Sequence, residues 1–288
     1  MRIAVTGSSG LLGGAVVSLA AQCGHTVVAI DQAEGKGAVL GEQPRGRIVS
    51  KLADASSHAE LQQAMDGCEA LIHLAANPSP HDAPAHRVHN NNVTSTYNAL
   101  DIAASQGINR VCLASSVNAI GGAYSRRPRY NYFPLDELHA TFSEDAYSLS
   151  KWIGEVQADS IARRFSNMSI ASMRFHQVVK SREVARSRSG RNPEIAAKHL
   201  WGYTTEDAAA RACILSLEAT FVGHEIFYIV APEIAVNQET MELCQQFYPQ
   251  VPIKSDLSGN RALFDSSKAA RLLAWRHDDN SDGMKSTQ

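Results

Sequence analysis

The sequence lacks the cysteine pattern that would cross-link the chain or hold a metal ion. Its five cysteines are an odd number, lie far apart and include no CxxC pair. Disulfide frameworks and zinc sites both depend on paired or closely spaced cysteines, so neither is expected here. We interpret the cysteines as small buried side chains, and no metal site is predicted.

Long apolar runs and a strong net charge are also missing. No run of 18 or more apolar residues occurs, so no membrane-spanning helix is expected. The 27 basic and 29 acidic residues nearly cancel to a net charge of -2, which excludes the basic face that nucleic-acid binding requires. The N-terminus lacks the basic and apolar segments of a signal peptide, so the expected location is the cytoplasm.

Apolar residues are abundant enough to build a core. Hydrophobic residues make up 44% and charged residues 19% of the 288 positions, which excludes a disordered protein. Short apolar runs alternate with stretches of helical spacing. Strands are expected at 2–6, 26–30, 47–52, 70–74, 110–114 and 169–175, and helices at 11–23, 59–65, 92–105 and 146–165. This alternation predicts βαβ units and a doubly wound, parallel α/β sheet.

The regular alternation weakens after residue 179. We therefore expect one domain over 1–179 and a smaller lobe over 180–288 that is interwoven with it. One helix (206–217) and one strand (225–230) are still recognisable in the second part. Residues 35–46 are rich in Gly and polar residues and predict a loop. The charged tail from His277 is expected to be frayed.

A glycine motif stands between the first expected strand and the first expected helix. Residues 6–13 read TGSSGLLG, which is TGxxGxxG. Gly7 permits a tight turn, Gly10 lets the backbone approach a pyrophosphate, and Gly13 allows close packing of helix on sheet. The free N–H groups of the helix N-terminus favour phosphate binding there. The motif therefore predicts a dinucleotide site.

The second expected strand ends at Asp31, and no Arg or Lys adjoins it. A carboxylate at this position accepts hydrogen bonds from the adenosine ribose and repels a 2′-phosphate. The sequence therefore favours NAD over NADP.

Tyr147 and Lys151 form a YxxxK motif on an expected helix. The spacing i, i+4 places the phenol and the ammonium on one helical face. A nearby cation is expected to lower the pKa of the phenol, whose ordinary pKa of about 10 makes it a poor base. Ser115 and Ser116 follow the fifth strand, at the sheet edge where ligands bind. A serine hydroxyl there can orient a reacting oxygen.

With these motifs the sequence resembles the extended short-chain dehydrogenases/reductases of the NAD-dependent epimerase/dehydratase group, from Met1 to about His277. The resemblance implies a Rossmann-type sheet that binds NAD, with a small C-terminal substrate-binding lobe. The catalytic residues that it implies are Ser116, Tyr147, Lys151 and Asn92. The cofactor-binding residues that it implies are Gly7, Ser9, Gly10, Leu11, Leu12, Gly13, Asp31, Leu52, Leu74, Ala75, Ala76 and Lys151.

The sequence departs from the family pattern in places. Lys51 stands where the family usually has an Asp that contacts adenine, and Ile120 where nucleotide-sugar epimerases usually have Tyr. The segment SSVNAIG (115–121) is closer to the corresponding segment of hexuronate dehydrogenases. These features, with the short C-terminal part, point away from a typical nucleotide-sugar epimerase.

The expected substrate contacts lie after the fifth and sixth strands and in a basic segment. They are Asn118, His176, Gln177 and Arg191. The segment 180–191 holds five cations and one acid; it is interpreted either as a solvated mobile loop or as a group that captures an anionic substrate. The same two readings apply to Arg126, Arg127 and Arg129. His81, His86 and His89 are expected in a Pro-rich loop near the nicotinamide, where one of them could line the substrate site. Trp201 and Tyr203 are expected to pack.

The combined hypothesis is an NAD-dependent oxidoreductase that transfers hydride reversibly between NAD and a secondary alcohol or hemiacetal carbon of a sugar-like or hydroxylated small molecule. One alternative is an epimerase that holds NAD tightly and returns the hydride. Dehydration is disfavoured because Val117 and Asn118 supply no carboxylate. A second alternative is a non-catalytic NAD(P) sensor, which is disfavoured because Tyr147 and Lys151 are both present. A homodimer is expected, with no nucleic-acid or membrane partner.

Overall fold

The computed structural model describes residues 1–33, 45–278 and 284. Most of the predicted loop over 35–46 and most of the tail beyond His277 lie outside the described residues. Within them, no helix is long and apolar enough to cross a membrane. All five cysteines are buried, as predicted.

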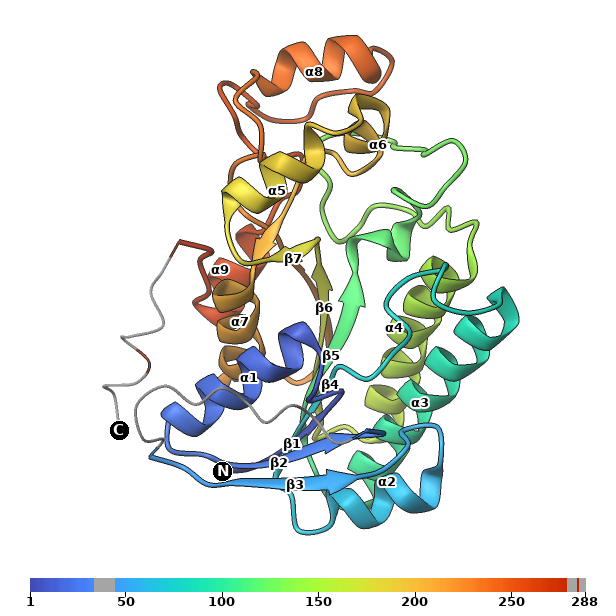
Figure 1. Ribbon diagram of the computed structural model, residues 1–288, viewed down its shortest axis with the longest axis vertical. Helices are drawn as coiled ribbons and strands as arrows, with labels where there is room; N and C mark the ends of the chain where they lie inside the picture. The colour runs from blue at the N-terminus through green and yellow to red at the C-terminus, as the bar shows by residue number, and fades with distance from the viewer. Residues whose placement is uncertain (34–44, 279–283, 285–288) are drawn as a thin grey trace.

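A seven-stranded parallel sheet organises the chain, in the order β3-β2-β1-β4-β5-β6-β9 (Figure 1). Its strands are β1 (Arg2–Thr6), β2 (Thr26–Asp31), β3 (Ile48–Leu52), β4 (Ala70–His73), β5 (Arg110–Ser116), β6 (Ser169–Phe175) and β9 (Gly223–Ile229). The order reverses direction between β1 and β4, which is the topological switch point of a doubly wound fold. The predicted fold class is confirmed.

Helices cover both faces of the sheet (Figure 1). One face packs against α1 (Leu11–Gln22), α7 (Glu206–Glu218) and α9 (Ser267–Leu273). The other packs against α2 (His58–Met65), α3 (Ala85–Ser105) and α4 (Ala146–Arg164). The strands are apolar on both faces because both are buried, and this is why their sequences read as continuous apolar runs rather than as alternation.

A small lobe lies beyond the carboxyl ends of β5 and β6 (Figure 1). It has its own apolar cluster, built around Phe133, Trp201, Tyr228 and Leu263. Its elements are η1 (Val117–Ile120), α5 (Arg182–Ser189), α6 (Pro193–Lys198), α8 (Thr240–Phe247) and the short pair β7 (Val178–Val179) and β8 (Thr204–Thr205). Trp201 and Tyr203 are buried in this part, as predicted. Helix α7 packs on the seven-stranded sheet and β9 is a strand of it, so the second predicted part is interwoven with the first. The division of the chain at residue 179 stays a prediction.

Two helical segments differ from the sequence prediction. Helix α3 begins at Ala85 rather than at residue 92, so His86 and His89 lie on a helix and not in a loop. Its first turns are polar, and Val88 alone is buried among residues 85–91, so no apolar periodicity marks them. Residues Arg182–Ser189, interpreted as a loop, form α5, in which Ala185 is the buried residue. A helix that buries one side chain leaves little signal in its sequence.

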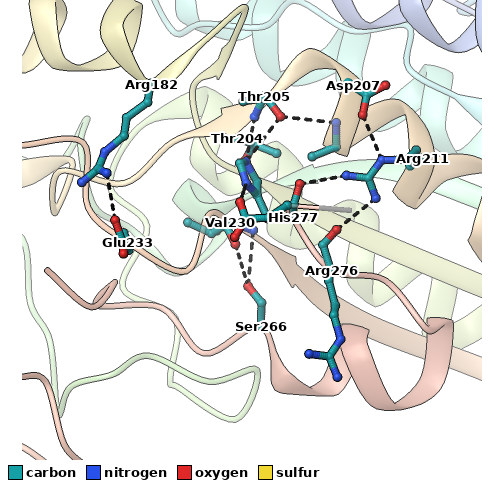
Figure 2. Close-up of polar contacts among 12 residues, drawn as sticks. Arg182, Thr204, Thr205, Asp207, Arg211, Val230, Glu233, Ser266, Arg276 and His277 are labelled. Atoms are coloured by element: carbon teal, nitrogen blue, oxygen red, sulfur yellow. Dashed lines mark hydrogen bonds and ion pairs between the residues drawn. The ribbon is translucent and has the colours of Figure 1, made fainter. Parts of the chain in front are cut away.

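The end of the described chain is tied to the start of α7 (Figure 2). The buried guanidinium of Arg211 donates to the carbonyl oxygens of Arg276 at 3.0 Å and His277 at 2.8 Å, and it pairs with Asp207 at 2.9 Å. The backbone N–H of Thr205 donates to Nε2 of His277 at 3.1 Å. These bonds fix the segment after α9 against β8 and α7.

Candidate active site

A cleft with a volume of about 750 Å³ runs along the carboxyl ends of the central strands. Its lining comes from the loop after β1, the ends of β2, β4, β5 and β6, the start of α4 and the residue after α6. Ligands of open α/β sheets bind at this edge, at the switch point of the strand order. A volume of this size lies within the usual range for a cofactor site.

The glycine loop is shaped for a close backbone approach. Gly7 has a φ of +68°, and a Cβ added there would lie 2.7 Å from the backbone N of Ala75. A Cβ on Gly13 would lie 2.1 Å from the carbonyl oxygen of Gly7, so any side chain would push α1 off the loop. No side chain caps α1, and the N–H groups of Leu11 and Leu12 bond to no described residue. These free donors and the bare loop fit a pyrophosphate.

The adenosine end of the cleft contains Asp31. Its carboxylate accepts from the backbone N–H of Ser9 at 2.9 Å, so the end of β2 is locked to the glycine loop. Ser9, Leu74, Ala75 and Ala76 also line the cleft, where the resemblance places them.

The last two residues of β3, Lys51 and Leu52, do not line the cleft. Lys51, which replaces the family's usual Asp, turns away and donates to the carbonyl oxygens of Gln63 and Ala64 on α2. Leu52, implied to be cofactor-binding, is 62% exposed and is not among the described residues that line the cleft. Ala53 and Asp54 line it instead. The lining at this end of the cleft thus begins one or two residues later than the resemblance implies.

Helix α4 presents two functional side chains, Tyr147 and Lys151, to the end of β5. Asp145 caps the helix by accepting from the N–H groups of Tyr147 at 3.0 Å and Ser148 at 2.9 Å, which fixes the first turn. Lys151 Nζ donates to the carbonyl oxygen of Ala114 at 2.7 Å. The Ser116 hydroxyl lies beside the Tyr147 phenol, close enough to favour its ionised form. The predicted Ser, Tyr and Lys therefore meet at one point of the cleft, and all three line it.

A buried ion pair lies directly behind these groups. Glu155, one turn beyond Lys151, accepts from Ser115 Oγ at 2.6 Å and from both Arg174 Nε at 2.9 Å and Arg174 NH2 at 2.8 Å. Arg174 also donates to the Tyr228 hydroxyl at 3.3 Å. Ser115, Arg174 and Tyr228 are register partners on β5, β6 and β9. The network thus links α4 to three neighbouring strands, and motif comparison did not find it.

The protonation states differ from the sequence prediction. Burial raises the pKa of Tyr147 above its ordinary value, and the neighbouring Ser116 hydroxyl opposes this rise only in part. Burial also lowers the pKa of Lys151 to about 8, against the opposing charge of Glu155. The Lys151 ammonium lies 5.8 Å from the centre of the Tyr147 ring. The prediction that Lys151 lowers the pKa of Tyr147 below 10 is wrong for this structure, because loss of hydration at the phenol dominates and the neighbouring Asp145 and Asp82 raise the pKa further.

Asn92 is fully buried and does not reach the cleft lining. Its Nδ2 donates to the Asn77 carbonyl at 3.1 Å and to Ser150 Oγ at 3.1 Å. Its Oδ1 accepts from the Asn77 N–H at 2.8 Å and from Asn91 Nδ2 at 3.3 Å. All its hydrogen-bonding capacity is used within the protein, and the catalytic role that the resemblance implies for Asn92 stays a prediction. Its contacts position the loop after β4 against α4.

Three of the four expected substrate contacts line the cleft, namely Asn118, His176 and Gln177. Arg191 is exposed, lies after α5 and does not line it; neither do Arg126, Arg127 and Arg129, nor the histidines at 81, 86 and 89. Tyr124 and His199 line the cleft without having been predicted. Neither belongs to a spaced motif, so only the folded chain reveals them. No cluster of three metal-ligating side chains occurs among the residues that the structure covers.

This geometry defines a dinucleotide-binding α/β protein with a tyrosine that can exchange a proton with a ligand. A family model described as the NAD dependent epimerase/dehydratase family matches residues 3–202, and the chain belongs to that family. It is a family of NAD-dependent dehydrogenases and epimerases, and NAD is its cofactor. The resemblance seen in the sequence is confirmed.

Curated relatives are similar over parts of the chain. A putative dihydroflavonol 4-reductase of Synechocystis sp. is 31% identical over 170 residues, which are 58% of this chain and 47% of that protein. An NAD-dependent glucose-6-phosphate dehydrogenase of Haloferax volcanii is 34% identical over 111 residues, which are 36% of this chain and 42% of that protein. The chain thus matches less than half the length of these two relatives.

Solved structures share the fold across the whole chain. MoeE5 in complex with UDP-glucuronic acid and NAD has a TM-score of 0.69 at 20% identity, covering 100% of this chain and 97% of the other. A mutated uronate dehydrogenase has a TM-score of 0.67 at 20% identity, covering 98% and 82%. At this identity the likeness establishes the fold alone.

The Glu155–Arg174 pair generates a stability prediction. Glu155→Gln leaves a buried guanidinium without its anion and is expected to lower the free energy of unfolding by about 3–5 kcal/mol. Urea unfolding at neutral pH measures it. The control is Asp256→Asn, which removes an ion pair with Arg261 that is exposed on both sides and contributes little. Equal unfolding midpoints for the two variants would contradict a structural role for the buried pair.

Proposed function

We propose that the protein is an NAD-dependent oxidoreductase of the extended short-chain type. It transfers hydride reversibly between NAD and a secondary alcohol or hemiacetal carbon of a sugar-like or hydroxylated small molecule, and it releases NADH. The observation that carries the proposal is the meeting of Ser116, Tyr147 and Lys151 beside the glycine loop in one cleft.

The proposed role of each residue follows from its position along the cleft. The loop from Gly7 to the start of α1 holds the cofactor phosphates, and Asp31 holds the adenosine ribose. NAD, when bound, supplies the hydride acceptor. Ser116 orients the substrate oxygen, and Tyr147 exchanges a proton with it. Lys151, held on the Ala114 carbonyl, contributes positive charge next to this oxygen and a donor for the nicotinamide ribose.

Net dehydrogenation is favoured over epimerisation. The segment 115–121 lacks the Tyr that nucleotide-sugar epimerases usually carry and has Ile120 there. Relatives include proteins named for dehydrogenation, among them the glucose-6-phosphate dehydrogenase and an L-arabinose 1-dehydrogenase of Haloferax volcanii. The epimerase alternative uses the same first step and returns the hydride before NADH leaves.

The release of NADH separates these two activities. Purified protein supplied with NAD and a panel of aldoses, uronic acids and hydroxylated natural products is expected to accumulate NADH in solution, read by its absorbance. Protein that retains NAD through purification, accumulates no free NADH and interconverts two sugar epimers would instead support the epimerase.

Tyr147→Phe tests the mechanism, because it removes the hydroxyl and keeps the ring. General acid–base catalysis is worth about 10²–10⁴ in rate, so kcat is expected to fall by that range while NADH affinity is retained. Since burial raises the pKa of Tyr147, the wild-type oxidation rate should rise with pH as the phenolate forms. The variant should lose this rise. Wild-type turnover in Tyr147→Phe would favour the non-catalytic sensor.

We also propose a homodimer formed through α3 and α4, which pack side by side on one face of the sheet (Figure 1). Three large apolar side chains are exposed on them: Tyr97 at 46%, Trp152 at 39% and Val156 at 46%. Such a cluster on one face is typical of an association surface.

Light scattering on the eluting protein is expected to give twice the chain mass for the wild type and one chain mass for Trp152→Glu. Val222→Glu, at an exposed apolar residue outside these helices, should stay dimeric. A monomeric wild type would exclude this assembly.

A further inference from the structure

The substrate end of the cleft consists of uncharged hydrogen-bonding groups. We define it by Asn118, Tyr124, His176, Gln177 and His199, which line the cleft beyond Tyr147. The carboxylates of the lining, Asp31 and Asp54, lie at the adenosine end. Of the described residues that line the cleft, Lys151 carries the one ammonium or guanidinium group. It is already bonded to the Ala114 carbonyl.

The cations nearest in sequence to the substrate end do not line the cleft. Arg182 reaches away to Glu233 at 2.8 Å and to the Ile234 carbonyl at 2.8 Å (Figure 2). Arg186, Arg188 and Arg191 are exposed and do not line the cleft. Lys198 lies at a small recess that adjoins the substrate end, and its ammonium donates to the carbonyl oxygens of Ser125 at 2.9 Å and Arg126 at 3.2 Å. Lys180 is likewise exposed, so the basic segment 180–191 contributes no cation to the described lining of the cleft.

His176 is held rigidly in the wall of the cleft. Its Nε2 lies 2.6 Å from the His199 carbonyl oxygen, and because a carbonyl only accepts, Nε2 carries the proton. Phe264 packs edge-on at 5.3 Å between ring centres. A Cβ on Gly202 would lie 2.8 Å from Cδ2 of His176, so only glycine at position 202 leaves room for the imidazole ring. The other nitrogen, Nδ1, is an acceptor that is buried and has no partner.

His199 is the complementary group. It ends α6, its backbone oxygen is fixed by His176, and its ring lines both the cleft and the recess. Neither of its ring nitrogens bonds to a described residue. Burial lowers the pKa of His199 to about 4 and that of His176 to about 3, so both rings are uncharged at neutral pH. The histidines therefore do not replace the missing cations.

We propose that His199 contacts the substrate directly and, with His176, selects an uncharged polyhydroxy compound over its carboxylate or phosphate counterpart. The proposal rests on the proposed function and specifies its substrate class. A hydroxyl both donates and accepts hydrogen bonds, so it can satisfy an imidazole acceptor and an amide donor such as that of Asn118. An ionised carboxylate or phosphate cannot donate to an acceptor, and its burial without a paired cation is costly.

Matched sugars that differ only at the terminal carbon test the selection. One set is D-galactose, L-arabinose and D-galacturonate, and the other is D-glucose, D-glucuronate and D-glucose 6-phosphate. The best neutral aldose is expected to exceed its anionic counterparts in kcat/KM by about tenfold or more, a difference of about 1.4 kcal/mol. Equal or greater kcat/KM for a uronate or sugar phosphate would overturn the proposal and leave the oxidoreductase function standing.

Substitutions at His199 test the residue, and its ring has no hydrogen bond to any described residue to lose. His199→Leu is expected to raise KM for the neutral aldose about three- to tenfold, the effect of one hydrogen bond, with kcat little changed. His199→Gln, which keeps a donor and an acceptor, should restore most of the affinity. His199→Arg supplies the missing cation and should shift the preference toward the uronate. Unchanged KM in His199→Leu would show that the ring does not contact the substrate.

Binding separates failure of this proposal from failure of the proposed function. Calorimetric titration of the NADH-loaded protein with the same sugars needs no turnover. If neutral sugars bind and none forms NADH, the selection holds and the oxidoreductase activity fails. If only anionic sugars bind, or if no neutral sugar binds, the selection is overturned. NADH affinity and thermal unfolding should match the wild type in every His199 variant.

Discussion

The site depends on the way in which the last three residues of β5 are joined to α4. Ala114 accepts from Lys151, Ser115 donates to Glu155, and the Ser116 hydroxyl lies beside the Tyr147 phenol. Three consecutive strand residues thus meet three side chains spaced four apart along one helical face. A shift of the helix by one turn would break all three contacts at once. The relative position of hydroxyl, phenol and ammonium is therefore set by register, before any ligand binds.

Burial then sets the protonation of these groups. The same packing that fixes α4 removes water from Tyr147 and Lys151, which raises the pKa of the phenol and lowers that of the ammonium. The Glu155–Arg174 pair lies buried one turn away, where the guanidinium donates two hydrogen bonds to the carboxyl group. Uncharged groups therefore line the substrate side of the cleft, and the buried Glu155–Arg174 pair lies behind them.

Much of the fold followed from the sequence because a buried parallel sheet leaves strong local signals. The runs at 2–6 and 169–175 matched β1 and β6 residue for residue, since both faces of these strands are covered. The start of α3 and the whole of α5 were missed because each buries few apolar side chains there. Among site residues, the spaced motifs found Tyr147, Lys151 and the glycine loop. His199 and the Glu155–Arg174 pair depend on contacts between distant segments, and no spacing encodes such contacts. The raised pKa of Tyr147 was missed for the same reason, since a motif does not report burial.

The placement of β9 has a consequence for the order in which the molecule is assembled on the ribosome. Its Tyr228 completes the hydrogen bonds of Arg174, and it pairs with β6 across some fifty intervening residues of chain. The carbonyls that Arg211 holds come later still, at Arg276 and His277. The nucleotide loop at residue 7 is thus synthesised well before the sheet edge that steadies the catalytic helix. A nascent chain released early would carry the phosphate-binding motif and lack the support of its active site.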